Sequence, residues 1–317
     1  MKLVIMVPCY NEENTLPLVF KSIPKQIEGV DAVETLIIDD GSSDKTAEVA
    51  KELGATKVVS HVGNKGLAKA FATGINTALD MGADIIVNTD GDNQYPQQSI
   101  PQLIKPIISG VADIVVGDRQ TSKISHFSFI KKRLQSFGSW VVRLASDTKI
   151  PDAVSGFRAY SREAALRLNV VTSFSYCVET IVQAGKRRIT ITHIPVETNP
   201  KTRESRLFKN MGQHIVESAK TIIRVYSMYQ PFKVFATLGV IILFVGVIGL
   251  GRFFYFYFFV PSQASGHIQS VVISSILFLV GFQVMLIGLL SDLISINRKL
   301  IEDALYRIKK IELKGKS

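Results

Sequence analysis

The sequence predicts an α/β protein with a mostly parallel sheet covered by helices, followed by two C-terminal transmembrane helices. Three observations carry this prediction. Short apolar runs alternate with helical patterns over about the first 120 residues, as in sheets built from strand–helix units. Polar residues cluster where four of the apolar runs end. Two late segments carry no charge and are long enough, or nearly so, to cross a bilayer.

The predicted elements follow one another at short intervals. Strands are expected at 2–8, 33–39, 56–60, 83–89 and 112–118. Helices are expected between them at 12–23, 42–54, 64–82 and 97–109. The third helix has one apolar face, formed by Leu67, Phe71, Ile75 and Leu79. This alternation favours a parallel sheet with helices on both faces, in which ligands bind at the carboxyl ends of the strands.

Polar side chains lie where that rule places a ligand. They follow the first, second, fourth and fifth strands and are Tyr10, Asn11, Glu12 and Glu13; Asp39, Asp40, Gly41 and Ser42; Asp90, Asp92 and Gln94; and Asp118 and Arg119. One such cluster could be a helix cap. Four clusters on one edge of one sheet predict a binding site.

The cluster after the fourth strand predicts a metal site. Two carboxylates one residue apart, Asp90 and Asp92, cannot both ionise without cost unless a cation lies nearby. Carboxylate and amide oxygens suit Mg²⁺ or Mn²⁺, so we expect Gln94 to join them as a ligand. Such a metal completes its shell with substrate phosphates, which implies a phosphorylated ligand. An isolated Asp-x-Asp is more often a solvated turn, but this one shares its edge with the other clusters.

The late apolar segments, 234–251 and 268–291, predict a multi-pass protein of the cell membrane. Lys and Arg precede the first and follow the second, whereas the connection at 261–267 has neither. The positive-inside rule therefore predicts that the catalytic domain and both termini are cytoplasmic. The net charge of +10 is explained by anionic lipid, so no nucleic-acid partner is expected. Arg252 either reaches the outer headgroups or is a functional charge in the membrane.

The segments "VPCYNEE", "IDDGSSDKT", "NTDGDNQYP" and "SGFRAY", in this order, resemble the inverting GT-A glycosyltransferases of family 2. They look closest to the branch that includes dolichyl-phosphate mannose synthases. The resemblance implies a Rossmann-like GT-A fold and a metal cofactor, Mg²⁺ or Mn²⁺. It also implies a nucleotide-sugar donor held by Pro8, Tyr10, Asn11, Glu12, Asp39, Asp40, Lys65 and Asp90.

The resemblance further implies transfer of a single sugar to a polyprenyl phosphate, undecaprenyl or dolichyl, at the cytoplasmic membrane face. UDP-sugar is the preferred donor and GDP-mannose the alternative. Asp92, Arg119 and Arg158 are the candidates for stabilising the departing diphosphate. Asp152 is a further catalytic candidate, because Gly156 stands where some relatives have an Asp in the "SGFR" segment. Glu179 either lines the acceptor cleft or lies on a helix surface.

Arg203 and Arg206 are predicted to bind the acceptor phosphate, since a guanidinium matches phosphate geometry. Simple attraction to anionic lipid is the alternative. Glu204 replaces a glycine that is common in the family's motif. A polysaccharide or glycolipid glycosyltransferase and a non-catalytic membrane scaffold that binds nucleotide-sugar are the rival functions.

We divide the chain into a catalytic domain (1–205), an amphipathic interface helix (206–231), a two-helix transmembrane hairpin (232–293) and a basic tail (294–317). A second amphipathic helix is expected at 129–145, and either helix could lie on the membrane or pack in the core. The tail has an apolar face that could pack on the domain or on another subunit of a homo-oligomer, formed by Leu300, Leu305, Ile308 and Ile311.

Overall fold

The computed structural model describes residues 1–120, 129–171, 176–200, 219–220, 223–224, 226–260 and 268–315, and at 129–135 and 137 it describes the backbone alone. The predicted interface helix at 206–231 therefore lies largely outside the described residues. So do Arg203 and Arg206.

A seven-stranded sheet forms the centre of the catalytic part, in the order β3-β2-β1-β4-β6-β5-β7. Its strands are β1 (Lys2–Cys9), β2 (Ala32–Asp39), β3 (Lys57–Ser60), β4 (Ile85–Asn88), β5 (Ile114–Asp118), β6 (Arg158–Ser161) and β7 (Ile191–Pro195). Among the strands that the structure describes, only β6 runs antiparallel, to its neighbours β4 and β5. The mostly parallel sheet and its first five strands confirm the sequence prediction, whereas β6 and β7 were not predicted.

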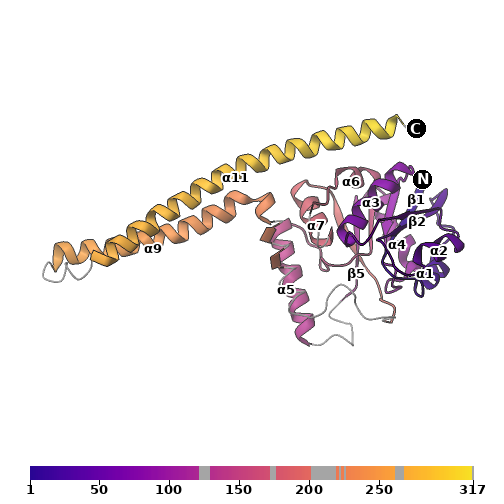
Figure 1. Ribbon diagram of the computed structural model, residues 1–317, viewed down its shortest axis with the longest axis horizontal. Helices are drawn as coiled ribbons and strands as arrows, with labels where there is room; N and C mark the ends of the chain where they lie inside the picture. Colours follow the sequence, from indigo (N-terminus) through magenta and orange to yellow (C-terminus); the bar gives the residue numbers. More distant parts are fainter. Residues whose placement is uncertain are drawn as a thin grey trace. The chain divides into compact units, whose positions relative to one another are not determined.

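Helices cover both faces of the sheet (Figure 1). They are α1 (Leu16–Ser22), α2 (Thr46–Glu52), α3 (Leu67–Asp80), η1 (Gln97–Ser99), α4 (Ile100–Ile108), α5 (Phe129–Ser146), α6 (Arg162–Arg167) and α7 (Tyr176–Lys186). Side chains of a strand point alternately to opposite faces. On β1, Val4 and Met6 pack in the cluster that contains residues of α3, α6 and α7. Leu3, Ile5 and Val7 pack in the cluster with residues of α1, α2 and α4.

The amphipathic pattern at 129–145 forms the helix α5, as predicted. Val142 and Ala145 are buried in the core, whereas Trp140 and Leu144 are 50% and 65% exposed. The helix therefore packs by one face and leaves a second, partly apolar face open. Core packing therefore applies to one side of this helix, and contact with the membrane stays a prediction.

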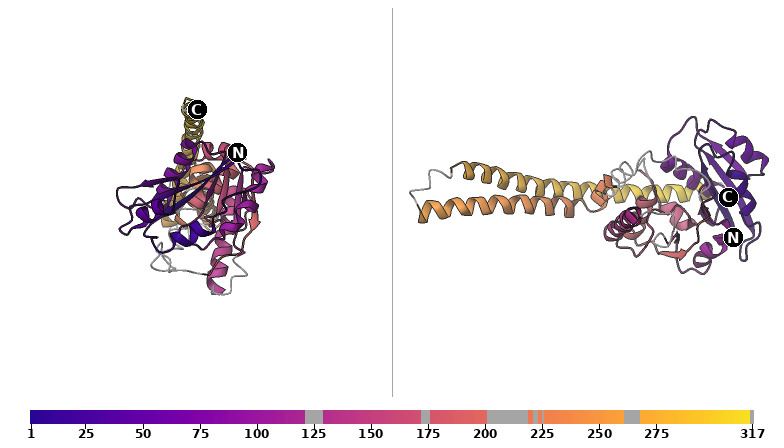
Figure 2. Two further views of the ribbon diagram at one scale, coloured as in Figure 1. Left: turned by 90° about the vertical axis from the view of Figure 1, so that its right-hand side faces the viewer. Right: turned by 90° about the horizontal axis from the view of Figure 1, so that it is seen from below.

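Two long apolar helices follow, α9 (Pro231–Phe259) and α11 (Ile268–Lys314), which lie side by side (Figure 2). Each has an 18-residue window apolar enough to cross a membrane, and only 11% and 17% of these windows are buried in the structure. Apolar side chains so widely exposed to solvent need another apolar environment. The two helices therefore suggest membrane association.

Small residues let the two helices approach each other. On α11 the buried positions Ser274, Gly281, Gly288 and Ser295 recur every seventh residue, and Gly239 and Gly246 are the buried glycines of α9. A Cβ atom on Gly281 would lie 2.6 Å from the backbone nitrogen of Leu243 and 2.8 Å from the carbonyl oxygen of Gly239. Backbones this close leave no room for side chains, which is a common packing mode of membrane helices.

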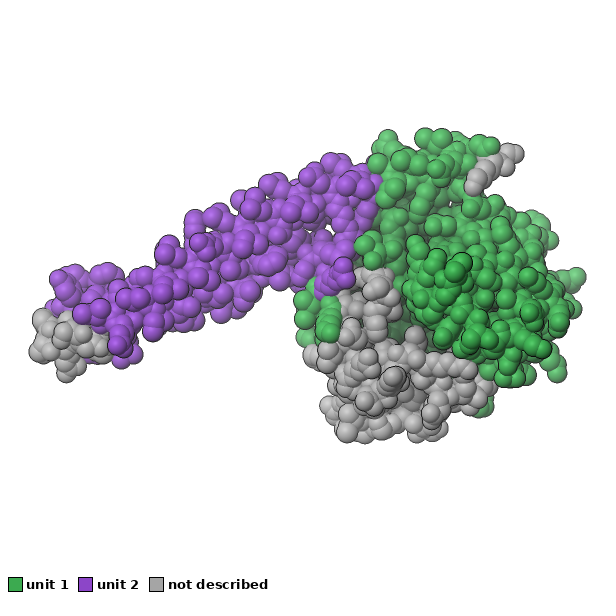
Figure 3. Space-filling view, viewed as in Figure 1, with its two compact units in different colours: residues 1–223, 304–317 green, residues 224–303 purple. Residues whose placement is uncertain are grey.

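The chain divides into two compact units, 1–223 with 304–317 and 224–303 (Figure 3). Most of α11 belongs to the second unit, and its last turns belong to the first. This grouping separates the end of the predicted tail from its beginning.

The first unit contains the sheet and is the catalytic unit. Within it, the last turns of α11 pack on the rest of the unit. Tyr306 and Leu313 lie against the core cluster of α3, α6 and α7. The Tyr306 hydroxyl donates to Glu163 Oε1 at 2.7 Å, and Lys309 Nζ donates to Asn169 Oδ1 at 3.2 Å. The tail thus packs on its own domain, but not by the predicted face, whose four apolar residues are 41% to 70% exposed. The side of the helix that carries Tyr306 and Leu313 makes the contact instead.

Candidate active site

The turn after β2 is organised by a buried carboxylate. Asp40 is 4% exposed. Its Oδ1 accepts from the backbone nitrogen of Lys65 at 2.9 Å and lies 2.7 Å from His61 Nδ1, and its Oδ2 accepts from Gly66 at 2.8 Å. Asp40 therefore fixes the loop before α3, while the Lys65 side chain is exposed. A Cβ on Gly41, at φ 71°, would overlap the backbone of Gly63, so this turn requires glycine.

The ends of β1 and β2 are joined by Asn11, which adopts the left-handed conformation with φ 57°. Its side-chain oxygen accepts from the Ser43 nitrogen at 2.8 Å, and its backbone nitrogen donates to the Ser42 hydroxyl at 2.9 Å. Glu12 is buried beside them, where its Oε2 accepts from the Thr15 hydroxyl at 2.6 Å.

The other residues near this junction that are predicted to bind the nucleotide-sugar differ in solvent exposure. Pro8 is buried at the end of β1, and Asp39 is 5% exposed with its Oδ1 accepting from the Ser42 nitrogen at 3.0 Å. Tyr10 is 39% exposed.

The loop after β4, residues 90–96, is called the metal loop below. It packs on the end of β1, because a Cβ on Gly91 would lie 2.9 Å from Cys9 Sγ and 3.2 Å from Glu12 Cγ. Burial raises the pKa of the Cys9 thiol, and the nearby carboxylates of Glu12, Asp39 and Asp90 raise it further. Acidic side chains that follow three strands therefore lie near Cys9.

The "SGFR" segment meets the metal loop at Gly156. A Cβ on Gly156 would lie 3.1 and 3.2 Å from the two carboxylate oxygens of Asp90, and 2.9 Å from the Tyr176 hydroxyl. The Gly156 carbonyl accepts from Asn88 Nδ2 at 2.7 Å, and its nitrogen donates to the Tyr95 hydroxyl at 2.9 Å. Two motifs that are about 65 residues apart in the sequence thus form one wall, with glycine where the carboxylate comes close.

Arg119 and Asp152 form a bidentate ion pair, with Nε to Oδ2 at 2.7 Å and Nη2 to Oδ1 at 3.0 Å. Burial by itself raises the pKa of Asp152, but the Arg119 guanidinium outweighs it and lowers that pKa. Asp152 is 2% exposed, so it stays ionised through its partner. A carboxylate held in this way is a poor proton acceptor.

Arg158 points into the protein rather than toward the sheet edge. It is 0% exposed. Its guanidinium donates at 2.7–2.9 Å to Ala153 O, Ser155 O, Cys177 O and the Thr180 hydroxyl. These bonds hold the backbone that leads to Gly156. Contact with a diphosphate, the role predicted from the sequence, would require this buried network to open.

Glu179 fits neither of its two sequence-based interpretations. It is completely buried, and its two carboxylate oxygens accept from the Val171 nitrogen at 3.1 and 3.2 Å. Gln183 Nε2 donates to the same carboxylate at 3.3 Å. Glu179 therefore binds the backbone at Val171 from a buried position.

The residues present fit a divalent cation of the magnesium type. Asp90 and Asp92 are half-buried on the metal loop, and Asp92 Oδ1 accepts from the Gln94 nitrogen at 3.1 Å. Within the described part of the chain, no three His, Cys, Asp or Glu side chains are arranged as a complete metal cage. Mg²⁺ commonly uses one or two protein carboxylates, waters and substrate phosphates, so a complete protein cage is not needed.

Sequence reasoning missed the side chains that support these loops, namely Asn88, Tyr95, Tyr176 and Asn199. Asn88 carried a signal, since an amide at the end of an apolar strand must find partners when buried. Tyr95 and Tyr176 carried none, because a buried aromatic residue is most simply a core residue.

The sequence matches the family described as "Glycosyl transferase family 2" over residues 4–168. This match covers more than half of the chain. The chain belongs to glycosyl transferase family 2. It is therefore a glycosyltransferase, and the resemblance found from the four motifs is confirmed.

Curated relatives carry more detailed names. One from Methanococcus voltae, a UDP-N-acetylglucosamine--dolichyl-phosphate N-acetylglucosaminyltransferase, is 29% identical over 61% of this chain and 84% of its own. A dolichol-phosphate mannosyltransferase from Pyrococcus furiosus is 31% identical over 71% of this chain, and the match spans 63% of that relative. A solved glucosyl-3-phosphoglycerate synthase from Mycobacterium tuberculosis, in complex with Mn²⁺ and UDP, shares 20% identity with a TM-score of 0.55, covering 71% and 78% of the two chains. That likeness supports the GT-A fold alone.

Proposed function

We propose that this glycosyltransferase moves a single sugar from a nucleotide-sugar to a polyprenyl phosphate at the cytoplasmic face of the cell membrane. UDP-sugar is the preferred donor, with GDP-mannose as the alternative. The products are a polyprenyl-phosphate sugar and a nucleoside diphosphate.

The observation that carries the proposal is the contact between Gly156 and Asp90. It brings the metal loop against the "SGFR" segment, at the same edge as the β1 and β2 turns. A metal-binding loop beside a site wall is what a diphosphate donor requires. The two relatives named after dolichyl phosphate support a lipid acceptor. The exposed apolar surface of α9 and α11 supports a membrane location.

The proposed chemistry is a direct displacement at the anomeric carbon. An oxygen of the acceptor phosphate attacks this carbon, and the bond from the carbon to the diphosphate oxygen breaks. The acceptor oxygen is already anionic at neutral pH, so the step needs no strong general base. This agrees with the pairing of Asp152, a further catalytic candidate, with Arg119.

The donor is proposed to lie over the ends of β1, β2 and β4. Tyr10 and the Asn11–Glu12 turn would contact the base and ribose from one side. Asp39 and Asp40, at the end of β2, and Lys65, in the loop before α3, would lie on the other side. Asp90, Asp92 and Gln94 would hold Mg²⁺ or Mn²⁺, which when bound neutralises the charge of the departing diphosphate. Arg119, which is 18% exposed beside this edge, is a further candidate for contact with that charge.

The acceptor phosphate is proposed to bind Arg203 and Arg206. Each charged hydrogen bond lost would cost roughly 1.5–3 kcal/mol, or about one to two decades in acceptor affinity. Arg206→Ala should therefore weaken acceptor affinity and leave donor binding intact in a non-ionic detergent. An unchanged acceptor response of the double alanine variant there would exclude the phosphate contact.

The experiment that tests the function uses the purified full chain, Mn²⁺ and a short-chain polyprenyl phosphate. A panel of radiolabelled UDP-sugars and GDP-mannose is supplied, and label is followed into an organic-extractable lipid. Label from one donor should appear there only when both metal and acceptor are present. Product without added polyprenyl phosphate would favour a different acceptor, and no product from any donor would favour the scaffold function.

A further inference from the structure

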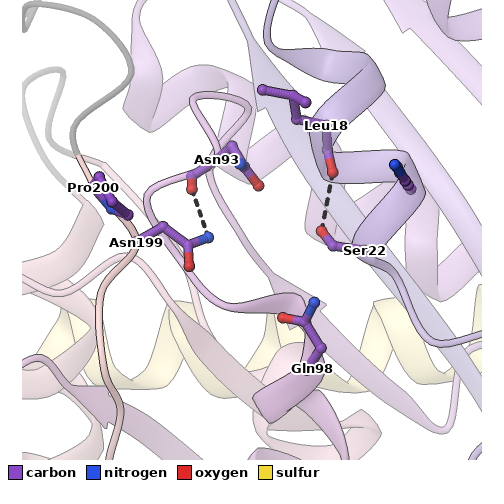
Figure 4. A pocket seen from close by; sticks show the side chains of 7 residues that line it. Leu18, Ser22, Asn93, Gln98, Asn199 and Pro200 are labelled. Atoms are coloured by element: carbon purple, nitrogen blue, oxygen red, sulfur yellow. Dashed lines mark hydrogen bonds between the residues drawn. The ribbon is translucent and has the colours of Figure 1, made fainter.

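Asn199 lies in the segment after β7 and connects that segment to the metal loop through both its backbone and its side chain. Its nitrogen donates to Gln94 O at 2.9 Å. Its Nδ2 donates to Asn93 O at 2.9 Å, shown in Figure 4, and to Tyr95 O at 3.4 Å. One residue thus reaches three successive carbonyl groups of the loop that begins with Asp90 and Asp92.

The metal loop needs such support on its outer side. Its inner side packs on β1 through Gly91. At Asn93 the loop borders an open pocket of about 510 Å³, whose lining also includes Asn199, Lys21 and Gln98 (Figure 4). A loop with a cavity on one side has little packing to fix it there, so its hydrogen bonds decide its conformation.

The loop also contains a backbone conformation that must be held. Asn93, directly after Asp92, has φ 58°. Asn tolerates this left-handed region better than most residues, but it remains less favourable than the extended or helical regions. The bond from Asn199 to the Asn93 carbonyl is formed at this residue.

We propose that Asn199 is a positioning residue, which holds the metal loop in the conformation that presents the Asp92 carboxylate to the metal and donor diphosphate. The proposal rests on the proposed function of the same loop. It assigns Asn199 no contact with substrate. Asn199 acts on the metal loop through its hydrogen bonds to the carbonyl groups of residues 93–95.

The test compares Asn199→Asp with the wild-type chain. The carboxylate has the same shape but lacks both Nδ2–H donors, and the backbone bond to Gln94 remains possible. Asn199→Ser, which keeps one shorter donor, should retain part of the function. Lys21 and Gln98 line the same pocket but do not make the Asn199 hydrogen bonds, so Lys21→Ala and Gln98→Ala serve as matched controls.

The readout is binding of UDP and of GDP at varied Mn²⁺, measured by calorimetry without acceptor, together with thermal unfolding. Asn199→Asp should weaken Mn²⁺-dependent nucleotide binding by about fivefold to thirtyfold, as expected for one or two lost hydrogen bonds. Asn199→Ser should lie between it and the wild type. The unfolding temperature and the metal-independent part of binding should change little.

Several results would overturn this assignment. Unchanged Mn²⁺ dependence in Asn199→Asp would show that the loop is held without its side chain. Unfolding of both Asn199 variants would make it a residue of general stability. Equal losses in Lys21→Ala and Gln98→Ala would show that the pocket itself binds a ligand. Failure of the wild-type chain to bind either nucleotide would instead contradict the proposed function.

Discussion

The internal contacts that stabilise the catalytic unit differ in kind from those that stabilise the α9–α11 hairpin. In the catalytic unit, buried polar side chains such as Asp40, Asn88 and Arg158 fix the loops through hydrogen bonds. In the hairpin, the contact depends on small residues such as Gly239 and Gly281, which let the backbones touch. Changes at the sheet edge should therefore alter chemistry or local order, and changes in the hairpin should alter helix packing.

The largest effect is expected where the loops carry chemistry. Asp92→Ala should reduce sugar transfer about a thousandfold or more, because a metal ligand supplies several kcal/mol of transition-state stabilisation. Its unfolding temperature should stay close to the wild-type value, since the side chain is half-buried on a loop. Transfer kinetics at saturating Mn²⁺ and thermal unfolding measure both quantities.

Asp80→Ala, at the exposed end of α3, is the matched control for removal of a carboxylate and should keep full activity. Near-normal turnover of Asp92→Ala would show that the metal site lies elsewhere.

The next effect is on the stability of the catalytic unit. Asp152→Asn leaves the Arg119 guanidinium without its anionic partner and should destabilise the fold by about 3–5 kcal/mol. Because the folded pKa of Asp152 is lowered, its contribution is present above the unfolded value of about 3.9 and is lost as pH falls through the folded pKa.

Denaturation of wild type and Asp152→Asn at neutral and acidic pH measures the contribution of the Asp152 carboxylate to the free energy of unfolding. The difference in that free energy between the two proteins should shrink in acid. Lost turnover with unchanged stability would instead make Asp152 a catalytic residue.

A smaller effect is expected in the hairpin. Gly281→Leu should destabilise the α9–α11 contact by about 1–3 kcal/mol through overpacking. Gly251→Leu is the matched control, because a Cβ on Gly251 meets nothing within 4 Å. Thermal unfolding in detergent should separate the two variants, with nucleotide binding preserved in both. Equal behaviour of the two would mean that the helices do not depend on this close approach.

The smallest effect is expected at the docked end of α11. Tyr306→Phe removes the hydroxyl that donates to Glu163, in a part-exposed setting, and should cost about 0.5–1.5 kcal/mol. Tyr255→Phe, whose side chain is 57% exposed on α9, should have no such cost. Denaturant unfolding distinguishes them, and an equal response of both would show that the tyrosine hydroxyl does not hold the tail.

The sequence allowed the framework to be predicted because its signals are local. Alternation of apolar runs and helical patterns located β1 to β5, and polar residues after the strands located the site edge. The four-residue strand β6 was missed, since "RAYS" is too short for a pattern and its pairing with β4 and β5 is determined by distant residues.

Long-range contacts explain the remaining differences. The pairing of Arg119 with Asp152 joins residues 33 positions apart, and Asn199 meets Asn93 across 106 positions. No local pattern announces such partners. The seven-residue spacing of Ser274, Gly281, Gly288 and Ser295 was visible in the sequence, but charge and hydropathy alone did not identify these residues as a packing surface.

The most direct test of the proposed reaction is phosphorus NMR of a mixture of the purified full chain, Mn²⁺, a short-chain polyprenyl phosphate and its cognate nucleotide-sugar. The account predicts that the phosphate monoester signal is replaced by a phosphodiester signal while nucleoside diphosphate appears in equal amount. A monoester signal that persists with every UDP-sugar and with GDP-mannose would contradict the proposed function. So would release of nucleoside monophosphate, because it would mean that a sugar phosphate, rather than a sugar, is transferred.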